Sequence, residues 1–271
     1  MSQHDVIVIG AGVIGTSVAF SLAALGAGRV VVLERAAVGS GTTAQSSGIL
    51  RTHYSVVENV DLARRSWHSF NHFAALLDDD EASAGLVKCG YLIAAPAGPR
   101  LEPLRAALQA QRAMGIEVQT LDAQSAMARL PICRFDDAAL IGYEPEAGFA
   151  DAYLVATGFA RAARRRGVKI IEGVEVHSLL RDHGRVVGVD TSQGRFDAPI
   201  VISAQNIWAQ SLERWTGVRT PLRAERHTVL ALEGPEPYAY TMPVYKDLGS
   251  RGMIYCRSYG GRQMLVSEGT S

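Results

Sequence analysis

The chain has 271 residues, 48% of them hydrophobic, and its 27 basic and 27 acidic side chains cancel. This length and apolar content predict a large buried core in two closely joined domains. The balanced charge argues against a nucleic acid or a membrane surface as partner. The three cysteines are odd in number, widely spaced and without a C-x-x-C pair, so we expect reduced, buried thiols and a cytoplasmic protein.

The first predicted element is a strand that leads into a glycine-rich turn. Val6 to Ile9 form an unbroken apolar run, as in a parallel strand that is covered on both faces. Gly10, Gly12 and Gly15 follow with the spacing G-x-G-x-x-G. In this pattern the glycines permit a tight turn, close approach of a pyrophosphate, and close packing of helix on strand. A helix predicted from about Val13 to Leu25 would direct its N-terminal amides at the phosphates.

A second buried strand, Val30 to Leu33, ends at Glu34, nineteen positions after Gly15. A carboxylate at this place accepts hydrogen bonds from an adenosine ribose, so the whole stretch predicts a dinucleotide-binding unit. The alternative is a membrane segment, because no charged residue occurs between Asp5 and Arg29. The glycines interrupt any spanning helix, and the leader MSQHD lacks the Lys or Arg of a signal peptide, so we expect no membrane segment.

A loop rich in Gly, Ser and Thr follows at residues 36–55, where a nicotinamide-binding domain would usually begin another strand-helix unit. Such a loop offers amides and hydroxyls to an elongated ligand, and a flexible linker is the alternative interpretation. From Val56 to Leu77, apolar residues recur at helical spacing, which predicts one long amphipathic helix with an aromatic stripe in the core.

The next interval resembles an excursion out of the nucleotide domain. Leu86 to Ala95 are predicted to form a strand and Pro103 to Met114 a helix. Asp122 is placed to cap a short helix that ends before Pro131.

The chain then returns with a helix that Asp151 is placed to cap. Arginines gather near the end of that helix, and they most simply form a solvated face that complements the helix dipole, with a basic binding patch as the alternative. The arginines are Arg161, Arg164, Arg165 and Arg166.

Strands dominate the rest of the chain. Val168 to Ile171 and Ala198 to Ser203 read as buried strands, with a hairpin of Glu175 to Leu180 and Arg185 to Val189 between them. An antiparallel sheet is predicted from Thr228 to Leu232, Met242 to Tyr245, Met253 to Arg257, and Met264 to Ser267.

These pieces, in this order, resemble the FAD-dependent amine and amino-acid oxidoreductases of the D-amino-acid oxidase, sarcosine oxidase or dehydrogenase, and dimethylglycine dehydrogenase type. The resemblance rests on GAGVIGTSVAFSLAALG leading to VVLER, GSGTTAQSSGILRTHYS, GFADAYLVATGFARAARRRGVKIIEGVEV, VVGVDTSQG leading to PIVISAQNIWAQSL, and GMIYCRSYGGRQMLVSEG. It implies an α/β chain (α+β overall) with a Rossmann-like FAD-binding domain at 1–85 and 145–220. An antiparallel-sheet substrate domain is implied at 86–144 and 221–271.

The resemblance also implies the residues that hold FAD. Gly10, Gly12 and Gly15 would hold the pyrophosphate, Glu34 and Arg35 the adenosine ribose, Thr42, Thr43, Ser47 and Gly48 the ribityl and flavin portion, and Val176 the adenine. No metal ligands are implied.

For the substrate, the resemblance implies that Arg51 receives a carboxylate. A guanidinium fork pairs bidentately with a planar carboxylate and would orient the substrate against the flavin. His53 would line the same cavity, and Tyr255 and Arg257 share one parity on their strand and would face the flavin. A surface arginine and a packed loop histidine are the simpler alternatives.

Three positions depart from the family pattern. Gln45 stands where relatives that attach flavin covalently have histidine, so we expect non-covalent FAD. Asn206 replaces a glycine and can still adopt a left-handed conformation. Leu265 aligns with a lysine that sarcosine oxidases use for oxygen activation, which favours a dehydrogenase over an oxidase.

The resemblance implies oxidation of a C–N bond in a small amine or amino acid that carries a carboxylate, such as an N-methylated glycine or a D-amino acid. FAD would supply the hydride chemistry, and oxygen or an electron-transfer protein would accept the electrons. Relatives usually continue past the position of Ser271, so we expect either a fragment or a shortened form, with an exposed sheet edge at Met264 to Ser267. The alternative functions are a truncated, non-catalytic FAD-binding or subunit-interface protein and an NAD-dependent dehydrogenase.

Overall fold

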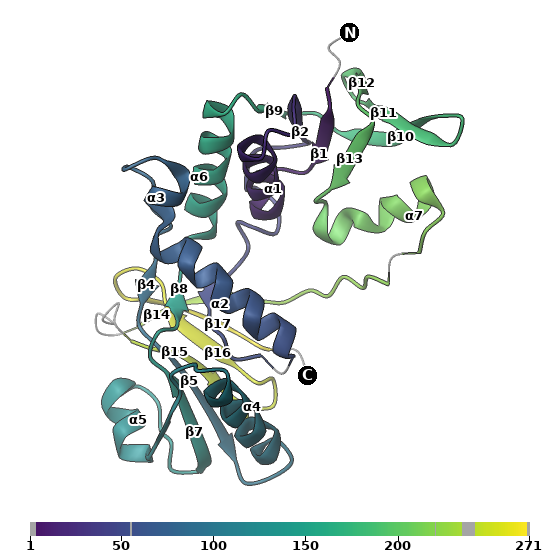
Figure 1. Cartoon of the computed structure of the whole chain (residues 1–271). Helices are drawn as coiled ribbons and strands as arrows, with labels where there is room; N and C mark the ends of the chain where they lie inside the picture. The colour runs from purple at the N-terminus through teal and green to yellow at the C-terminus, as the bar shows by residue number, and fades with distance from the viewer. Residues whose placement is uncertain (1–3, 55, 220, 235–241, 270–271) are drawn as a thin grey trace. The chain divides into compact units, whose positions relative to one another are not determined.

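The computed structural model describes residues 4–54, 56–219, 221–234 and 242–269, so the leader residues Met1 to Gln3 and the loop residue Ser55 lie outside it. The chain divides into two compact units (Figure 1). The first unit contains Met1–Ser46, His72–Ala84 and Asp151–Glu225, and the second contains Ser47–Asn71, Gly85–Ala150 and Arg226–Ser271. These units differ from the predicted domain boundaries mainly at 47–71, which the prediction places with the FAD-binding domain.

The first unit is built on a parallel sheet with the strand order β13-β1-β2-β9. Its strands are β1 (Val6–Ile9), β2 (Val30–Glu34), β9 (Lys169–Glu172) and β13 (Ile200–Ser203). The unbroken apolar runs of β1 and β2 are buried along almost their whole length, as predicted. One set of their side chains packs against an antiparallel sheet of β10 (Val176–Asp182), β11 (Arg185–Thr191) and β12 (Gly194–Asp197). The predicted hairpin is therefore confirmed, with β12 as an additional strand.

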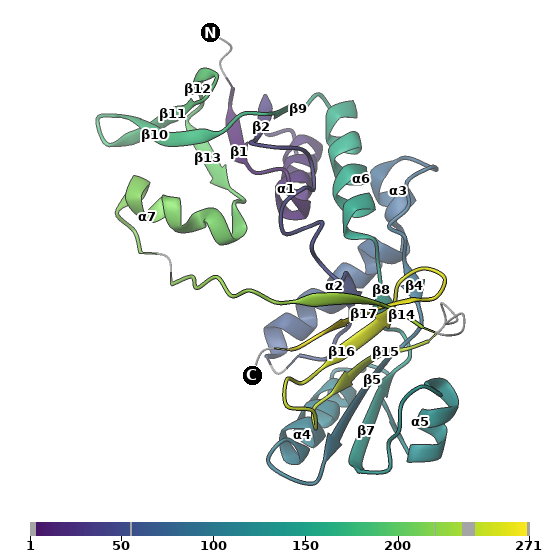
Figure 2. The same ribbon diagram turned by 180° about the vertical axis from the view of Figure 1, so that it is seen from behind.

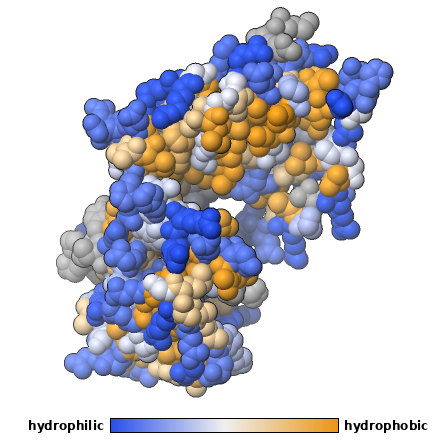
Figure 3. Space-filling model, in the orientation of Figure 1, coloured by the Kyte–Doolittle hydropathy of each residue, from blue (hydrophilic) through white to orange (hydrophobic). Residues whose placement is uncertain are grey.

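Helices α1 (Val13–Ala24) and α6 (Ala152–Arg165) lie side by side in this unit (Figures 1 and 2). Phe20 and Phe159 meet between them with ring centroids 5.5 Å apart. The Asp151 carboxylate accepts hydrogen bonds from two backbone amides in the first turn of α6, which confirms the predicted cap. In Figure 3 hydrophobic residues gather on the surface of this unit. Its exposed apolar side chains include Ile14 of α1 and Leu25, which follows α1.

The arginine cluster of α6 takes part in the structure of the first unit. Arg161 and Arg165 both form ion pairs with Asp79, which follows the short helix α3 (Phe73–Leu77). Helix α3 packs on α6, where Phe73 and Leu77 lie against Gly158. Two of the four arginines therefore pair with a carboxylate of the same unit, which argues against a basic binding patch and adds an ion-paired role to the predicted solvated face.

The second unit is built on a seven-stranded sheet with the order β14-β17-β16-β15-β5-β7-β6. Its strands are β5 (Tyr91–Pro96), β6 (Gln119–Leu121), β7 (Ala138–Glu144), β14 (Val229–Glu233), β15 (Val244–Asp247), β16 (Tyr255–Ser258) and β17 (Gln263–Ser267). The four strands predicted as an antiparallel sheet, β14 to β17, do pair antiparallel, and this part of the prediction is confirmed. The sheet then continues through a parallel pairing of β15 with β5. The predicted exposed edge at β17 is wrong, because β17 lies between β14 and β16 and the edge strand at that end of the sheet is β14.

Helices cover the two faces of this sheet. Leu104 and Leu108 of α4 (Leu101–Ala113) pack on Tyr91 and Ile93, and α5 (Ala123–Arg129) packs with Leu92 and Ala94 of the opposite face. The Asp122 carboxylate accepts a hydrogen bond from Ser125 N, so the predicted cap of α5 is confirmed. The three thiols are free; Cys89 and Cys256 are buried and Cys133 is half-buried.

Two predicted elements are interrupted in the structure. The helix predicted from Val56 to Leu77 is two helices, α2 (Val57–Asn71) and α3, because His72 leaves the helical conformation between them. The strand predicted from Leu86 to Ala95 is β4 (Val87–Lys88) followed by β5, with Gly90 at φ 82° between them. Strand β4 belongs to a small sheet with β8 (Gly148–Phe149) and β3 (Ile49–Leu50).

Among the described residues, no helix combines the length and the apolarity that crossing a bilayer requires.

Candidate functional site

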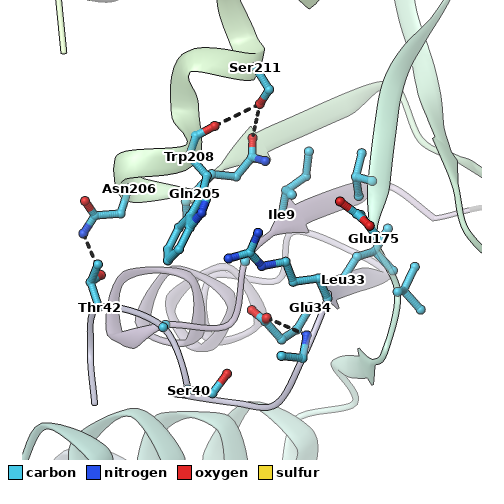
Figure 4. Close-up of a pocket in the computed structure, with 18 of the residues that line it drawn as sticks. Ile9, Leu33, Glu34, Ser40, Thr42, Glu175, Gln205, Asn206, Trp208 and Ser211 are labelled. Carbon is cyan, nitrogen blue, oxygen red and sulfur yellow. Dashed lines mark hydrogen bonds between the residues drawn. The ribbon is translucent and has the colours of Figure 1, made fainter. Parts of the chain in front are cut away.

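The first unit contains a cavity of about 570 Å³ at the carboxyl ends of β1 and β2 (Figure 4). Seven residues that the resemblance assigns to FAD line this single cavity: Gly10, Gly12, Glu34, Arg35, Thr42, Thr43 and Val176. The carboxyl ends of parallel strands are the usual ligand-binding edge of an open α/β sheet. Gln45, where covalent attachment would be expected in some relatives, lines the same cavity.

The glycine turn brings helix α1 close to strand β1. A Cβ atom on Gly15 would lie 1.8 Å from Gly10 O, so any larger residue would push the helix away from the strand. A Cβ atom on Gly10, which has φ 98°, would lie 2.9 Å from Ala204 O. Helix α1 has no acidic residue in its first turn, so its N-terminal dipole is available to an anion.

Glu34 holds the turn together from the end of β2. Its Oε2 accepts a hydrogen bond from Ala11 N at 2.7 Å, and its Oε1 accepts one from Ala36 N at 2.9 Å. A carboxylate has about four acceptor positions, so two remain for the hydroxyls of a ribose. The residue therefore shapes the loop and also presents acceptors to the cavity.

The two threonines of the Gly, Ser and Thr-rich loop bind protein groups on either side of the cavity. Thr43 Oγ1 accepts a hydrogen bond from Val13 N at 3.0 Å and so fastens the loop to the first turn of α1. Thr42 Oγ1 accepts a hydrogen bond from Asn206 Nδ2, also at 3.0 Å. Asn206 has φ 49°, so the left-handed conformation expected at this position is confirmed.

Further lining residues were not assigned from the sequence. They follow β13, where the 3₁₀ turn η1 (Asn206–Ala209) leads into α7 (Gln210–Thr216). The Arg35 guanidinium lies over the Trp208 ring, 4.2 Å from its centroid. In Figure 4 Trp208 from η1 and Glu34 from the end of β2 point into the same space. An aromatic residue soon after a buried strand is an ambiguous signal, because it is equally typical of core packing.

The donors and acceptors of this cavity fit the adenosine and pyrophosphate part of a dinucleotide. Close backbone approach at Gly10 and Gly12, the anion-attracting end of α1 and the acceptors of Glu34 are all present. Among the described residues, no group of His, Cys, Asp and Glu side chains is arranged to hold a metal ion.

Ser47 and Gly48, the two remaining assigned cofactor residues, belong to the second unit. A Cβ atom on Gly48, which has φ 65°, would lie 2.1 Å from Ala150 O, so glycine is required there. Ser47 O accepts a hydrogen bond from Arg257 Nε at 2.6 Å. Arg257 is buried, and its guanidinium also lies over the Phe149 ring. It therefore fixes the loop that leads to Arg51.

Arg51 is half-buried in the second unit and rests on aromatic rings. Its guanidinium carbon is 4.3 Å from the Tyr54 ring centroid and 5.6 Å from that of Tyr91. No carboxylate of the described residues forms an ion pair or hydrogen bond with it. Stacked arginines keep their N–H edges free, so this guanidinium is positioned to bind an anion in its plane.

His53 lies beside Tyr91 and is connected to three buried polar side chains. Its Nδ1 is 2.9 Å from Gln111 Oε1, Gln111 Nε2 donates to Thr52 Oγ1, and Thr52 donates to Glu144 Oε1. Burial lowers the pKa of His53 to about 4, although the hydrogen bond with Gln111 opposes this shift. Burial raises the pKa of Glu144 above its usual value, against the hydrogen bonds from Thr52.

Tyr255 and Arg257 share a face of the seven-stranded sheet. Tyr255 pairs with Lys246 on β15, and Lys246 in turn pairs with Ile93, which packs under α4. Lys246 was not predicted from the sequence. It is half-buried, and desolvation, followed by the charges of Arg51 and Arg100, lowers its pKa. The second unit thus brings together two cations, a neutral histidine and several tyrosines.

Residues 5–271 match the sequence model of the family described as FAD dependent oxidoreductase. The chain therefore belongs to this family, whose FAD dependence agrees with the cavity of the first unit.

Two curated proteins show the relationship in more detail. Human mitochondrial sarcosine dehydrogenase is 31% identical over 266 residues, which cover 96% of this chain and 28% of that protein. The 4-methylaminobutanoate oxidase (formaldehyde-forming) of Paenarthrobacter nicotinovorans is 27% identical over 259 residues, 96% of this chain and 31% of that protein. The chain thus spans less than a third of the length of either relative.

Solved structures show the same fold. L-proline dehydrogenase from P. horikoshii superimposes with a TM-score of 0.87 at 22% identity, covering 100% of this chain and 72% of that one.

Proposed function

We propose that this chain is the FAD-binding and substrate-binding part of an oxidoreductase that oxidises the C–N bond of a small N-methylated amino acid or related amine bearing a carboxylate. The observation that carries the proposal is the half-buried Arg51, which rests on Tyr54 and Tyr91 and has no carboxylate partner among the described residues. Partial burial of a guanidinium without a carboxylate partner raises the free energy of the protein unless a ligand supplies the opposite charge.

The glycine turn, Glu34 and Arg35 would hold the adenosine and pyrophosphate of FAD, with Thr42 and Thr43 beside them. Bound FAD supplies the acceptor for the hydride that leaves the substrate carbon. We propose non-covalent binding, because Gln45 has no nucleophilic ring nitrogen to form the linkage. Ser47 and Gly48 would continue the cofactor site, with the loop fixed by Arg257.

Arg51 would bind the substrate carboxylate bidentately, and His53 and Tyr255 would complete the pocket. The names of the two relatives support this substrate class, since sarcosine and 4-methylaminobutanoate both combine an N-methylamino group with a carboxylate. Leu265 replaces the lysine expected in oxidases, so we assign an electron-transfer protein rather than oxygen as the acceptor. A cytoplasmic location and the division into a FAD-binding and a substrate-binding domain are parts of the same proposal.

A titration of the purified chain with FAD, followed by anaerobic addition of amines, tests the proposal. We expect FAD to bind, and sarcosine, dimethylglycine or D-alanine to bleach its absorbance. Arg51→Gln should raise the half-bleaching concentration about 30-fold, equivalent to the ~2 kcal/mol of a charge-assisted pair. Arg51→Lys should recover only part of this loss, because it keeps the charge but not the fork.

Two other outcomes would favour the alternative functions. FAD binding without bleaching by any amine would favour a non-catalytic FAD-binding or subunit-interface protein. Binding of NADH in place of FAD would overturn the proposal in favour of a nicotinamide-dependent enzyme.

A further inference from the structure

We infer that Gln111 is a positioning residue that fixes the tautomer of His53. The proton is held on Nδ1, and Nε2 is kept as a hydrogen-bond acceptor for an N–H of the substrate amine. The first half of this inference concerns the protein alone, and the second half rests on the proposed function.

The direction of the hydrogen bonds in this chain of side chains follows from its carboxylate end. Glu144 Oε1 accepts a hydrogen bond from Thr52 N at 2.8 Å and one from Thr52 Oγ1 at 2.7 Å. The single hydroxyl proton of Thr52 is therefore donated to Glu144. The Thr52 oxygen can then only accept, and it does so from Gln111 Nε2 at 3.4 Å. This orients the Gln111 amide with Oε1 toward His53.

The orientation of the amide determines the protonation of the ring. Gln111 Oε1 lies 2.9 Å from His53 Nδ1 and is an acceptor only, so Nδ1 must carry the proton. A neutral imidazole has one proton, and Nε2 is then a bare acceptor. Gln111, Thr52 and Glu144 are 1%, 3% and 3% exposed, so water does not compete with these hydrogen bonds.

The surroundings keep the ring neutral. Burial is the main cause of the lowered pKa of His53, and the charges of Arg51 and Lys246 lower it further. Tyr91 stacks on the ring with centroids 6.2 Å apart, and burial holds the pKa of its phenol at about 12, so Tyr91 is also neutral. Glu144 is the one carboxylate of the network, and Thr52 and Gln111 separate it from the ring.

The His53 ring and the Arg51 guanidinium both contact the Tyr91 ring. An acceptor on His53 near an arginine to which the proposed function assigns a carboxylate would select one chemical class. A ligand with a carboxylate and a nearby N–H donor satisfies both Arg51 and His53, whereas an ether of the same shape presents a lone pair to Nε2. We therefore expect sarcosine to be preferred over methoxyacetate, which differs from it by replacement of the amine with an ether oxygen. His53 orients the amine in this scheme, and no proton transfer to the ring is required.

Two-dimensional ¹H–¹⁵N spectra of the imidazole side chains test the first half without substrate, with His53→Asn identifying the signals that belong to His53. We expect the Nδ1–H pattern in the wild-type chain. Gln111→Met should shift both nitrogens toward the averaged values of a ring that exchanges tautomers, and Gln119→Met is the matched control that should change nothing. A wild-type Nε2–H pattern overturns the inference, whether or not the Gln111 variant folds.

The second half is tested by calorimetric binding of sarcosine and methoxyacetate to the FAD-loaded chain. His53→Asn keeps a donor toward Gln111 but has no atom in the place of Nε2. We expect this variant to bind sarcosine about tenfold more weakly or worse, and to bind methoxyacetate less than about twofold more weakly. Equal losses for the two ligands overturn the role of Nε2. Failure of every amine to bleach FAD would overturn the proposed function while leaving the tautomer result intact.

Discussion

Glu144 shows how a single buried carboxylate can make the stability of the second unit depend on pH. Only one of its oxygens is used, since Oε1 accepts both hydrogen bonds from Thr52 while the buried Oε2 has no partner. Burial therefore penalises the ionised form more than the hydrogen bonds favour it, and the pKa is raised above the usual 4.5.

The raised pKa predicts how stability changes with pH. The folded chain binds the Glu144 proton more tightly than the unfolded chain does, so this group's contribution is complete below pH 4.5 and is lost as pH rises through the raised pKa. Glu144→Gln removes the titration. We expect the variant to gain stability relative to wild type as pH increases across this window, measured as the difference between their urea midpoints.

The exposed Glu117→Gln is the control for this measurement, and its midpoint difference from wild type should stay constant with pH. A constant difference for Glu144→Gln as well would show that Glu144 does not titrate as inferred.

Residues of this network also show the limit of sequence reasoning. Arg51 and His53 could be nominated because the loop at 36–55 that contains them resembles a family motif. Gln111 and Glu144 could not, because a glutamine on a helix and a glutamate at a strand end are typical of surfaces. Their burial depends on tertiary pairing, for example that of Glu144 with Tyr91 in the sheet.

At the scale of elements, the contact between α1 and β1 limits what the first unit can bind. Gly15→Ala would place a methyl group 1.8 Å from Gly10 O, so the first turn of α1 must move. We expect FAD to bind about tenfold more weakly or worse, since overpacking costs about 1–3 kcal/mol. Fluorescence titration with FAD gives the dissociation constant.

Gly158→Ala separates stability from binding in this experiment. Its methyl group would meet the Phe73 ring at 2.9 Å on the far side of α6, away from the cavity. We expect a lower melting temperature with an unchanged dissociation constant for FAD. If both variants bind FAD like wild type, the turn does not hold the pyrophosphate.

The elements that could be predicted are those with strong local signals. The strands β1 and β2, the caps Asp122 and Asp151, and the hairpin turn at His183 and Gly184 all carry their signal within a few residues. The break at His72 could not be foreseen, because the apolar period continues through it, and the two sides belong to different compact units. The parallel pairing of β15 with β5 likewise depends on residues far apart in the sequence.

At the scale of the whole molecule, β14 is the least protected element of the described chain. It ends the seven-stranded sheet, and all its residues are exposed, including Leu230 at 53% and Leu232 at 48%. An apolar edge strand is a template for pairing with another chain. We expect Leu230→Lys to reduce aggregation at a given concentration by about half or more, as measured by light scattering.

Leu25→Lys is the comparison for this prediction, because Leu25 is also an exposed leucine, at 83%, but lies on a helix end of the first unit. A strand-edge mechanism predicts a clearly larger effect at Leu230. Equal effects at the two positions would assign the aggregation to general surface hydrophobicity instead.

The interleaving of the two units has a consequence for the order in which a ribosome can complete them. Each unit draws on three separate segments, and in the first unit Val6 pairs with Ile200. Strand β1 is synthesised first, but its neighbour β13 is synthesised only after β5, β6 and β7 of the second unit. Such distant pairing slows folding. Because each unit is made of three interleaved segments, a single cut in the gene cannot yield either unit as a separate product.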